Sequence, residues 1–177
     1  DIFGCSVSDG TLWFYRNTSS TVSLPAYEPT FIRDAFGISG YGERAKPAFT
    51  DIDGDGDMDL FVGDSNGNIT CYENLADSLG GPQFRLLGTN LFGIANVGSL
   101  ASPTFSSTGD LVIGTGYQGV FFLKRQADGS FGTAAKIISH TDFNGESNLG
   151  DIGFCCSPTF ADLDGDGDED LLIANGT

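Results

Sequence analysis

Residues 51–59 read Asp51-Ile-Asp-Gly-Asp-Gly-Asp-Met-Asp59, and residues 162–170 repeat the pattern as Asp162-Leu-Asp-Gly-Asp-Gly-Asp-Glu-Asp170. Each of these two acidic loops follows Pro-x-Phe and precedes an apolar run. Carboxylates at alternate positions of a short, glycine-containing loop are the ligands that a hard cation such as Ca²⁺ requires. We therefore predict two Ca²⁺ sites, whose candidate ligands are Asp51, Asp53, Asp55, Asp57 and Asp59 in the first loop and Asp162, Asp164, Asp166, Asp168 and Asp170 in the second.

The spacing of the aspartates indicates how each loop would bind its ion. Like charges set this close repel one another, so the folded loop needs a cation. An EF-hand requires a bidentate Glu at position 12, but that position is apolar in both loops. The ninth-position residues, Asp59 and Asp170, are therefore expected to close the cage. By analogy with the EF-hand, Asp57 and Asp168 at position 7 contribute a backbone carbonyl and are weaker side-chain candidates. A solvated acidic run is the alternative, but such runs do not alternate Gly and Asp.

Composition and charge exclude several classes of protein. The chain has 177 residues with a formal net charge of -16, which argues against nucleic acid and anionic membranes as partners. No apolar stretch approaches the roughly 20 residues of a membrane-spanning helix, so no membrane insertion is expected. Hydrophobic residues make up 40%, enough to build a core. Because the chain begins with Asp1 rather than Met, we expect a processed product or part of a longer protein.

The four cysteines do not have the spacing of a zinc site. They are Cys5, Cys71, Cys155 and Cys156. Millimolar extracellular calcium suits the acidic loops, and that compartment permits disulfides. Adjacent cysteines do not easily pair with each other, so one of Cys155 and Cys156 could reach Cys5. The sequence leaves the pairing open.

A repeated segment combines a glycine turn with alternating apolar residues. It occurs at residues 10–17, 67–74 and 119–126, and alternation with period two predicts a strand. Cys71 occupies a position that the other copies fill with Phe or Leu, which predicts that it is buried in the core.

A second landmark sets the length of the repeat. Pro-x-Phe begins at Pro47, Pro103 and Pro158, at intervals of 56 and 55 residues, and Phe-Gly-Ile precedes the first two copies. Each unit reads as four short antiparallel strands, which predicts one propeller blade. The expected organisation is a blade lacking its first strand at 1–46, a blade with a calcium loop at 47–102, a blade without one at 103–157, and the start of a further blade with a calcium loop at 158–177.

The third of these units departs from the pattern. Of the acidic loop, only its last aspartate remains, as Asp110, so no metal is predicted there. Asp142, Asn144 and Glu146 resemble a further loop superficially, but they align with the linker and are interpreted as surface residues.

Three repeats' worth of chain cannot close a propeller, which needs four to eight blades. Unclosed sheets expose strand edges that associate readily. Further repeats must cover them, either from copies of this chain, in a ring or a filament, or from a longer propeller of which this chain is a slice.

The sequence around the acidic loop, Pro-Ala-Phe-Thr-Asp-Ile-Asp-Gly-Asp-Gly-Asp-Met-Asp-Leu-Phe-Val-Gly, resembles an FG-GAP repeat of the VCBS type. It is similar to the calcium-binding blades of the integrin alpha-subunit propeller, and the resemblance covers nearly the whole chain. It implies an all-β, Ca²⁺-stabilised propeller that is secreted or on the cell surface. Such repeats occur in adhesion receptors, propeller lectins and modules of polysaccharide-degrading enzymes, so the resemblance implies no single activity.

Three functions compete. The first is an extracellular structural or adhesive module without enzymatic activity. The second is a glycan-binding lectin or a non-catalytic module of a polysaccharide-active enzyme, in which exposed aromatic side chains stack on sugars. The third is an enzyme, which we do not expect because His140 lacks a catalytic partner pattern and metal explains the paired aspartates better than glycosidase chemistry does. The candidate stacking residues are Trp13, Tyr15, Tyr41 and Tyr117.

Three sequons make the chain a candidate glycoprotein. They begin at Asn17, Asn68 and Asn175, beside predicted turns or strand ends where a glycan would fit.

Overall fold

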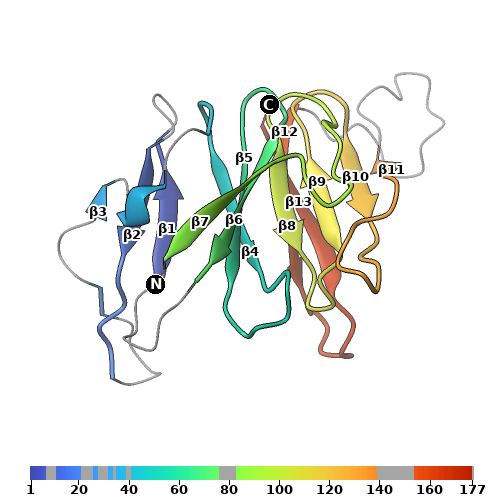
Figure 1. Ribbon diagram of the computed structural model, residues 1–177. Helices are drawn as coiled ribbons and strands as arrows, with labels where there is room; N and C mark the ends of the chain where they lie inside the picture. Colours follow the sequence, from blue (N-terminus) through green and yellow to red (C-terminus); the bar gives the residue numbers. More distant parts are fainter. Residues whose placement is uncertain are drawn as a thin grey trace.

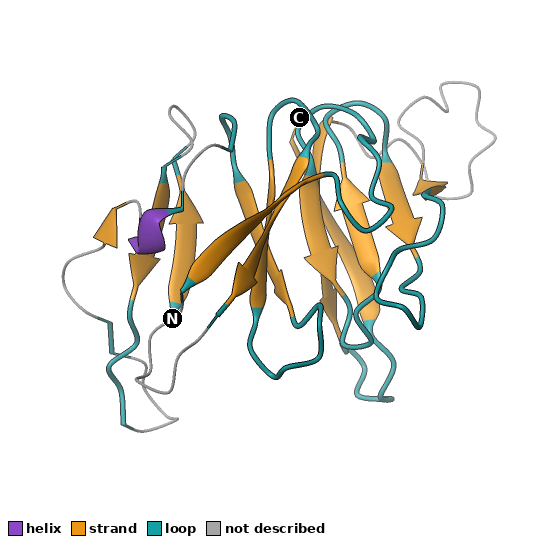
Figure 2. Ribbon diagram, viewed as in Figure 1, coloured by secondary structure: helices purple, strands orange, loops and turns teal. Residues whose placement is uncertain are grey.

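The computed structural model describes residues 1–6, 11–20, 26–27, 32–33, 35–38, 41–75, 83–138 and 154–176. Within these ranges the chain forms four antiparallel sheets and one short 3-10 helix, η1 (Ala35–Gly37) (Figures 1 and 2). The first sheet contains β1 (Ile2–Cys5), β2 (Leu12–Tyr15) and β3 (Ile32–Arg33). The second contains β4 (Lys46–Thr50), β5 (Asp59–Gly63), β6 (Ile69–Asn74) and β7 (Phe84–Thr89). The third contains β8 (Ser102–Phe105), β9 (Leu111–Gly114), β10 (Val120–Leu123) and β11 (Ala135–Ile138), and the fourth contains β12 (Phe154–Ala161) and β13 (Asp170–Gly176).

In every sheet, strands that follow one another in the chain are neighbours. The sheets also follow one another in space: β8 contacts both β4 and β12, and β1 contacts β4. In Figure 1 the first sheet lies on the left, the second in the middle and the third on the right, with β12 and β13 behind β8 and β9. The predicted all-β class is confirmed. Within the described residues the four sheets do not close into a ring.

The strands β5 and β9, inside the second and third sheets, are buried on both faces. Side chains alternate along β5, so that Leu60 and Val62 pack toward the first sheet while Phe61 packs toward the third. Along β9 the same alternation places Leu111 against the second sheet and Val112 against the fourth. This two-sided burial explains why the residues after each acidic loop form a continuous apolar run rather than an alternating one.

Strand pairing corrects one detail of the predicted repeat. Leu60 pairs with Tyr72 and Leu111 with Leu123, so Cys71 corresponds to Phe122 rather than to Leu123. The error arose because the turn glycine sits one residue later in the third sheet than in the second. Cys71 itself is fully buried, as predicted.

Successive sheets approach most closely at the ends of β5 and β9, where the chain has glycine. A Cβ atom on Gly63 would lie 2.2 Å from the carbonyl oxygen of Ala101, and one on Gly114 would lie 2.3 Å from that of Cys156. Real Cβ atoms do not approach backbone oxygens this closely, so any side chain here would push the two sheets apart. In the first sheet Cys5 occupies the equivalent position, since it pairs with Leu12 as Gly63 pairs with Ile69.

The chain enters each sheet through an unusual backbone conformation. Arg44, Leu100 and Cys155, each three residues before the Pro-x-Phe proline, have φ angles of 55°, 59° and 57°. Positive φ is uncommon outside glycine, yet it recurs here at the same place in three repeats. The three residues at this position therefore share a backbone conformation but not a side-chain type.

No helix within the described ranges is both long and apolar enough to cross a membrane.

The close approach of the sheets predicts a position-specific effect of alanine. Gly114→Ala places a methyl group against the carbonyl oxygen of Cys156, so we expect unfolding free energy to fall by about 1–3 kcal/mol, as for other overpacked sites. Gly4→Ala is the matched control, because a Cβ atom there meets nothing within 4 Å. Urea denaturation of both variants measures the difference. Equal stability of the two variants would contradict the assigned contact.

Candidate metal centre

The first acidic loop is folded around the carboxylate of Asp51. Its Oδ1 accepts a hydrogen bond from the amide of Gly54 at 2.6 Å, and its Oδ2 accepts one from the amide of Gly56 at 3.0 Å. Both glycines have positive φ, 84° and 96°, while a Cβ atom on either would meet nothing within 4 Å. The loop therefore needs glycine for its backbone conformation and not for space.

The next two aspartates each close a local turn. Asp53 accepts a hydrogen bond from the amide of Asp55 at 3.2 Å, and Asp55 accepts one from the amide of Asp57 at 2.8 Å. These are the side-chain-to-backbone turns that aspartate favours two residues ahead of an amide. One oxygen of each carboxylate orders the loop in this way.

Asp59 anchors the loop to the sheet. It is 1% exposed, and its carboxylate accepts hydrogen bonds from the amides of Ile52 and Asn74, both at 2.8 Å. Burial raises the pKa of Asp59, against the lowering effect of these two amides. Asn74 is the last residue of β6, so this hydrogen bond ties the start of β5, the second strand of the sheet, to the end of β6, the third strand.

The same anchor recurs without an acidic loop. Asp1 accepts a hydrogen bond from the amide of Asn17, and Asp110 accepts one from the amide of Arg125, both at 2.8 Å. The ninth-position aspartate is therefore first a structural residue, a role that the sequence interpretation missed. The aspartate left at position 110 and the alignment of Asp1 with Asp59 were the available signals.

The structure brings together some of the predicted ligands and not others. One carboxylate oxygen from each of Asp51, Asp53 and Asp59 lies within 4.8 Å of the others. Asp162, Asp164 and Asp166 form the corresponding group in the second loop. All oxygen ligands of this kind suit a hard cation, so both clusters could hold a metal ion. The remaining predicted ligands lie outside these groups: Asp55 and Asp57 in the first loop, and Asp168 and Asp170 in the second.

The second acidic loop reproduces the hydrogen bonds of the first. Asp162 accepts from Gly165 at 2.7 Å and from Gly167 at 3.1 Å, and Asp170 accepts from Leu163 at 3.1 Å. The turns of Asp164 and Asp166 match those of Asp53 and Asp55, at 3.2 and 2.9 Å. Because the first cluster is partly buried and the second is exposed, the shared geometry comes from the local Asp-Gly pattern rather than from the surroundings.

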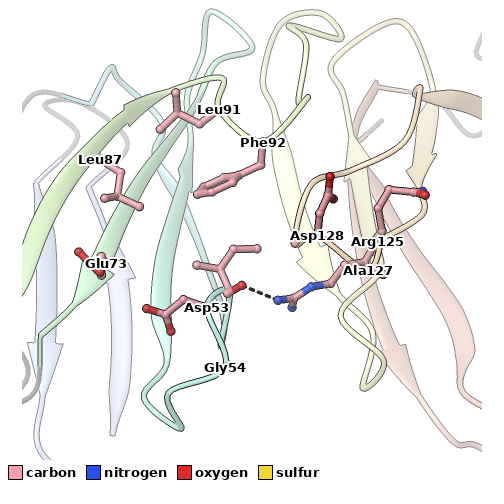
Figure 3. Close-up of a pocket in the computed structure, with 12 residues that line it drawn as sticks. Asp53, Gly54, Glu73, Leu87, Leu91, Phe92, Arg125, Ala127 and Asp128 are labelled. Carbon is pink, nitrogen blue, oxygen red and sulfur yellow. Dashed lines mark hydrogen bonds between the residues drawn. The ribbon is translucent and has the colours of Figure 1, made fainter.

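The loop of the third sheet, residues 106–109, lies between the two acidic loops. Arg125 donates a hydrogen bond to the carbonyl oxygen of Asp51 at 2.9 Å and another to that of Ile52 at 2.6 Å, and Figure 3 shows the second of these. On the other side, Glu169 of the second acidic loop accepts hydrogen bonds from the amide and hydroxyl of Ser107 at 2.7 and 2.9 Å. These contacts join segments far apart in the sequence, and the repeat pattern did not reveal them.

The third sheet balances its anchor aspartate with a cation from the protein. Lys124 donates to Asp110 at 2.7 Å, and Thr108 donates to the same carboxylate oxygen at 3.2 Å. Burial alone would raise the pKa of Asp110, but the hydrogen bonds from Lys124 and from the Arg125 amide, with the ammonium charge, hold it below its ordinary value. A lysine thus faces the carboxylate where the acidic loop is missing.

A cavity of about 730 Å³ separates the second and third sheets beside the first acidic loop. Figure 3 shows Asp53 and Glu73 on one wall, Arg125 and Asp128 on the other, and Phe92 between them at the top. A ligand in this cavity would contact the outer side of the first acidic loop.

The predicted glycosylation sites differ in their surroundings. Asn17 and Asn175 are exposed. Asn68 uses its whole side chain in hydrogen bonds: its Nδ2 donates to Asp64, and its Oδ1 accepts from Asn90 and Asn96, all at 3.1 Å. A glycan on Asn68 would have to displace the bond to Asp64.

The predicted stacking residues also divide. Trp13 and Tyr117 are 37% and 55% exposed. Tyr15 and Tyr41 are half-buried, and the hydroxyl of Tyr41 accepts a hydrogen bond from the amide of Leu12 at 3.1 Å. His140, Asp142, Asn144 and Glu146 lie outside the described residues.

The environment of Asp110 predicts a pH-dependent contribution to stability. Because its folded pKa is below the unfolded value of 3.8, the unfolded chain takes up the proton first as the pH falls. The contribution is therefore present above about pH 4 and is lost as the pH falls through the folded pKa. Asp110→Asn, which keeps an oxygen for the Arg125 amide, should destabilise the fold by about 1 kcal/mol at pH 7.

Urea denaturation of both proteins from pH 7 to about pH 2, well below the ordinary aspartate pKa of about 3.9, measures this effect. The difference in stability should shrink toward zero at the acidic end. A difference that is constant with pH would show that the charge of Asp110 does not contribute.

Comparison with known proteins found no family model that matches the chain, no similar curated protein and no similar solved structure.

Proposed function

We propose that the chain is an extracellular, Ca²⁺-stabilised propeller module with a structural or adhesive role and no enzymatic activity. The observation that carries this proposal is the pair of acidic loops with the same hydrogen bonds, each placed between the first and second strands of a sheet. A loop built twice in one way, with only oxygen ligands, is a device for holding an ion of one kind in a fixed place.

Calcium is the cation that best suits these loops. Ca²⁺ accepts six to eight oxygen ligands in flexible geometry, whereas Mg²⁺ demands a near-ideal octahedron. Asp51, Asp53 and Asp59 would hold the ion in the first loop, and Asp162, Asp164 and Asp166 in the second. An exposed cluster such as the second is suited to the millimolar calcium found outside cells, which supports a secreted or cell-surface location.

The bound ion would supply positive charge where the loop has none of its own. The carboxylates of each loop repel one another, and the amides of its glycines offset only part of that charge. The chain's own residues hold the loop in shape and attach it, through Asp59 and Arg125, to the second and third sheets. Metal binding would therefore stabilise the contact between sheets as well as the loop.

The arrangement of the sheets supports the propeller. Four-stranded antiparallel sheets succeed one another with their first strands adjacent, as blades do around an axis. Within the described residues β13 pairs only with β12, and Asp170 lacks the third-strand amide that Asp1, Asp59 and Asp110 each bind. Strands from further repeats, in the same chain or in a second copy, would complete this sheet by strand addition.

A glycan-binding role is the second candidate, favoured by the cavity of about 730 Å³ between the second and third sheets. It combines one aromatic side chain, Phe92, with several polar groups, a composition common in ligand sites. The exposed aromatics Trp13 and Tyr117 do not line it. Glycan-array binding that Phe92→Ala abolishes would favour this candidate, whereas binding lost only in Trp13→Ala or Tyr117→Ala would place the sugar elsewhere.

Calcium should stabilise the fold measurably. At a calcium concentration 100 times the dissociation constant, each site adds about 2.7 kcal/mol to the free energy of unfolding. The paired variant Asp53→Ala/Asp164→Ala removes one ligand from each cluster and leaves the anchor residues in place, so it should lose most of this gain. Asp128→Ala is the control, since this exposed carboxylate lies outside both loops.

Thermal unfolding with calcium and with a chelator, together with calorimetric titration, makes the test. Two sites should be seen in the parent chain and in Asp128→Ala. Identical melting with calcium and with chelator would rule out a stabilising calcium site.

Assembly is tested by electron microscopy of the purified chain in calcium, with a chelated control. We expect rings or filaments that dissociate on chelation, because the ion fixes loops that contact a neighbouring sheet. Monomers in both conditions would contradict self-assembly and leave a module of a longer repeat protein.

A further inference from the structure

Three of the four cysteines line one small cavity. It has a volume of about 200 Å³ and lies where the chain enters the sheets. Cys5 comes from the first sheet and Cys155 and Cys156 from the fourth, while the intervening wall is built by residues of the second and third sheets, Lys46 and Ser102 among them. Residues about 150 positions apart in the sequence are therefore brought to one enclosed space.

The fourth cysteine is elsewhere. Cys71 is fully buried in the apolar core between the second and third sheets, where burial raises the pKa of its thiol to about 12. A thiol that stays protonated and out of reach of solvent does not undergo disulfide exchange. This removes Cys71 from the possible pairings.

Cys155 and Cys156 differ in accessibility. Cys156 is 1% exposed and packs with Val112 and Val120 between the third and fourth sheets. Cys155 is exposed. It also occupies the positive-φ position shared with Arg44 and Leu100, and all three of these residues line the same cavity. The backbone conformation therefore directs the side chain at this position toward the cavity.

Cys5 is placed where the second and third sheets have glycine and the fourth has Ala174. Its counterparts Gly63 and Gly114 leave no room for a Cβ atom beside the next sheet. The Cys5 thiol instead contacts the carbonyl oxygen of Ala45 at the wall of the cavity. The Cys5 thiol therefore faces the same cavity as Cys155.

We propose that Cys5 and Cys155 form a disulfide that joins the first and fourth sheets across this cavity. Disulfide geometry requires the two Cα atoms to come within roughly 7 Å, so formation closes the cavity and draws the two sheets together. The proposal needs neither the metal ions nor the assembly proposed above, and it stands if both of those fail.

Oxidised glutathione, or another small disulfide of an oxidising compartment, is the oxidant. The thiolate of the exposed Cys155 attacks one sulfur of the glutathione disulfide, which breaks its S–S bond and releases one glutathione thiolate. The Cys5 thiolate then attacks the Cys155 sulfur of the mixed disulfide and releases the second glutathione. Two protein thiols lose two protons and two electrons, and the oxidant is reduced to two glutathione molecules. Burial raises the pKa of the Cys5 thiol, and the positive charge of Lys46 offsets part of that rise.

The test begins with the reduced, folded chain in a buffer of oxidised and reduced glutathione, followed by intact mass and non-reducing peptide mapping. We expect a monomer lighter by about 2 Da, the two hydrogens lost, with one cross-linked peptide pair that contains Cys5 and Cys155. Cys5→Ser and Cys155→Ser should each abolish the mass change. Cys156→Ser and Cys71→Ser should retain it.

Three results would overturn the proposal. They are no loss of mass in the parent chain, a loss that persists in Cys5→Ser, and a cross-link found only between molecules. Circular dichroism of each variant confirms that it folds before oxidation. Should Cys5→Ser fail to fold, the parent chain is oxidised while folded, then denatured and alkylated. Cys5 and Cys155 must then both be protected from alkylation, whereas Cys156 must react.

Discussion

A carboxylate that binds the backbone of a neighbouring strand is the contact on which the first three sheets depend. The aspartate at the start of the second strand accepts the amide hydrogen at the end of the third, in Asp1 with Asn17, Asp59 with Asn74 and Asp110 with Arg125, each at 2.8 Å. A charged acceptor makes a stronger hydrogen bond than a neutral one, and removal of Asp59 would leave the buried amide of Asn74 without this partner. The anchor is present with and without an acidic loop, so a metal site is an addition to a sheet that is already ordered.

Packing between sheets imposes the second constraint. Because Leu60 and Phe61 face different neighbours, β5 is buried on both sides. Its ends must also let the next sheet approach, and Gly63 and Gly114 provide that approach. The position that breaks this rule, Cys5, is the one whose side chain opens onto a cavity with other thiols. A departure from the repeat thus marks a place where a side chain has a separate role.

Sequence patterns predicted what is local and missed what is not. Alternating Asp and Gly predicted both acidic loops, because the turns that shape them involve residues two to five apart. The spacing of Pro47 and Pro103 predicted the succession of sheets. The register of β10 was misplaced, since turn chemistry alone does not say where in a turn the glycine falls. The bonds of Arg125 to the first acidic loop span more than 70 residues, and no periodic pattern encodes such a contact.

The second and third sheets each bury an aspartate at the same position, but the charged groups around the two carboxylates differ. Asp59 and Asp110 occupy the same place, and burial disfavours the charged form of both. In the third sheet Lys124 donates to the carboxylate and lowers its pKa, whereas the pKa of Asp59 is raised, and Asp53 and Asp55 add to the rise. A buried carboxylate whose charged neighbours are further carboxylates becomes more stable as an anion when positive charge is bound beside it. In the third sheet Lys124 supplies positive charge and the pKa of Asp110 is lowered, whereas the pKa of Asp59 in the second sheet is raised. This contrast supports a cation at the first acidic loop more strongly than the number of aspartates does.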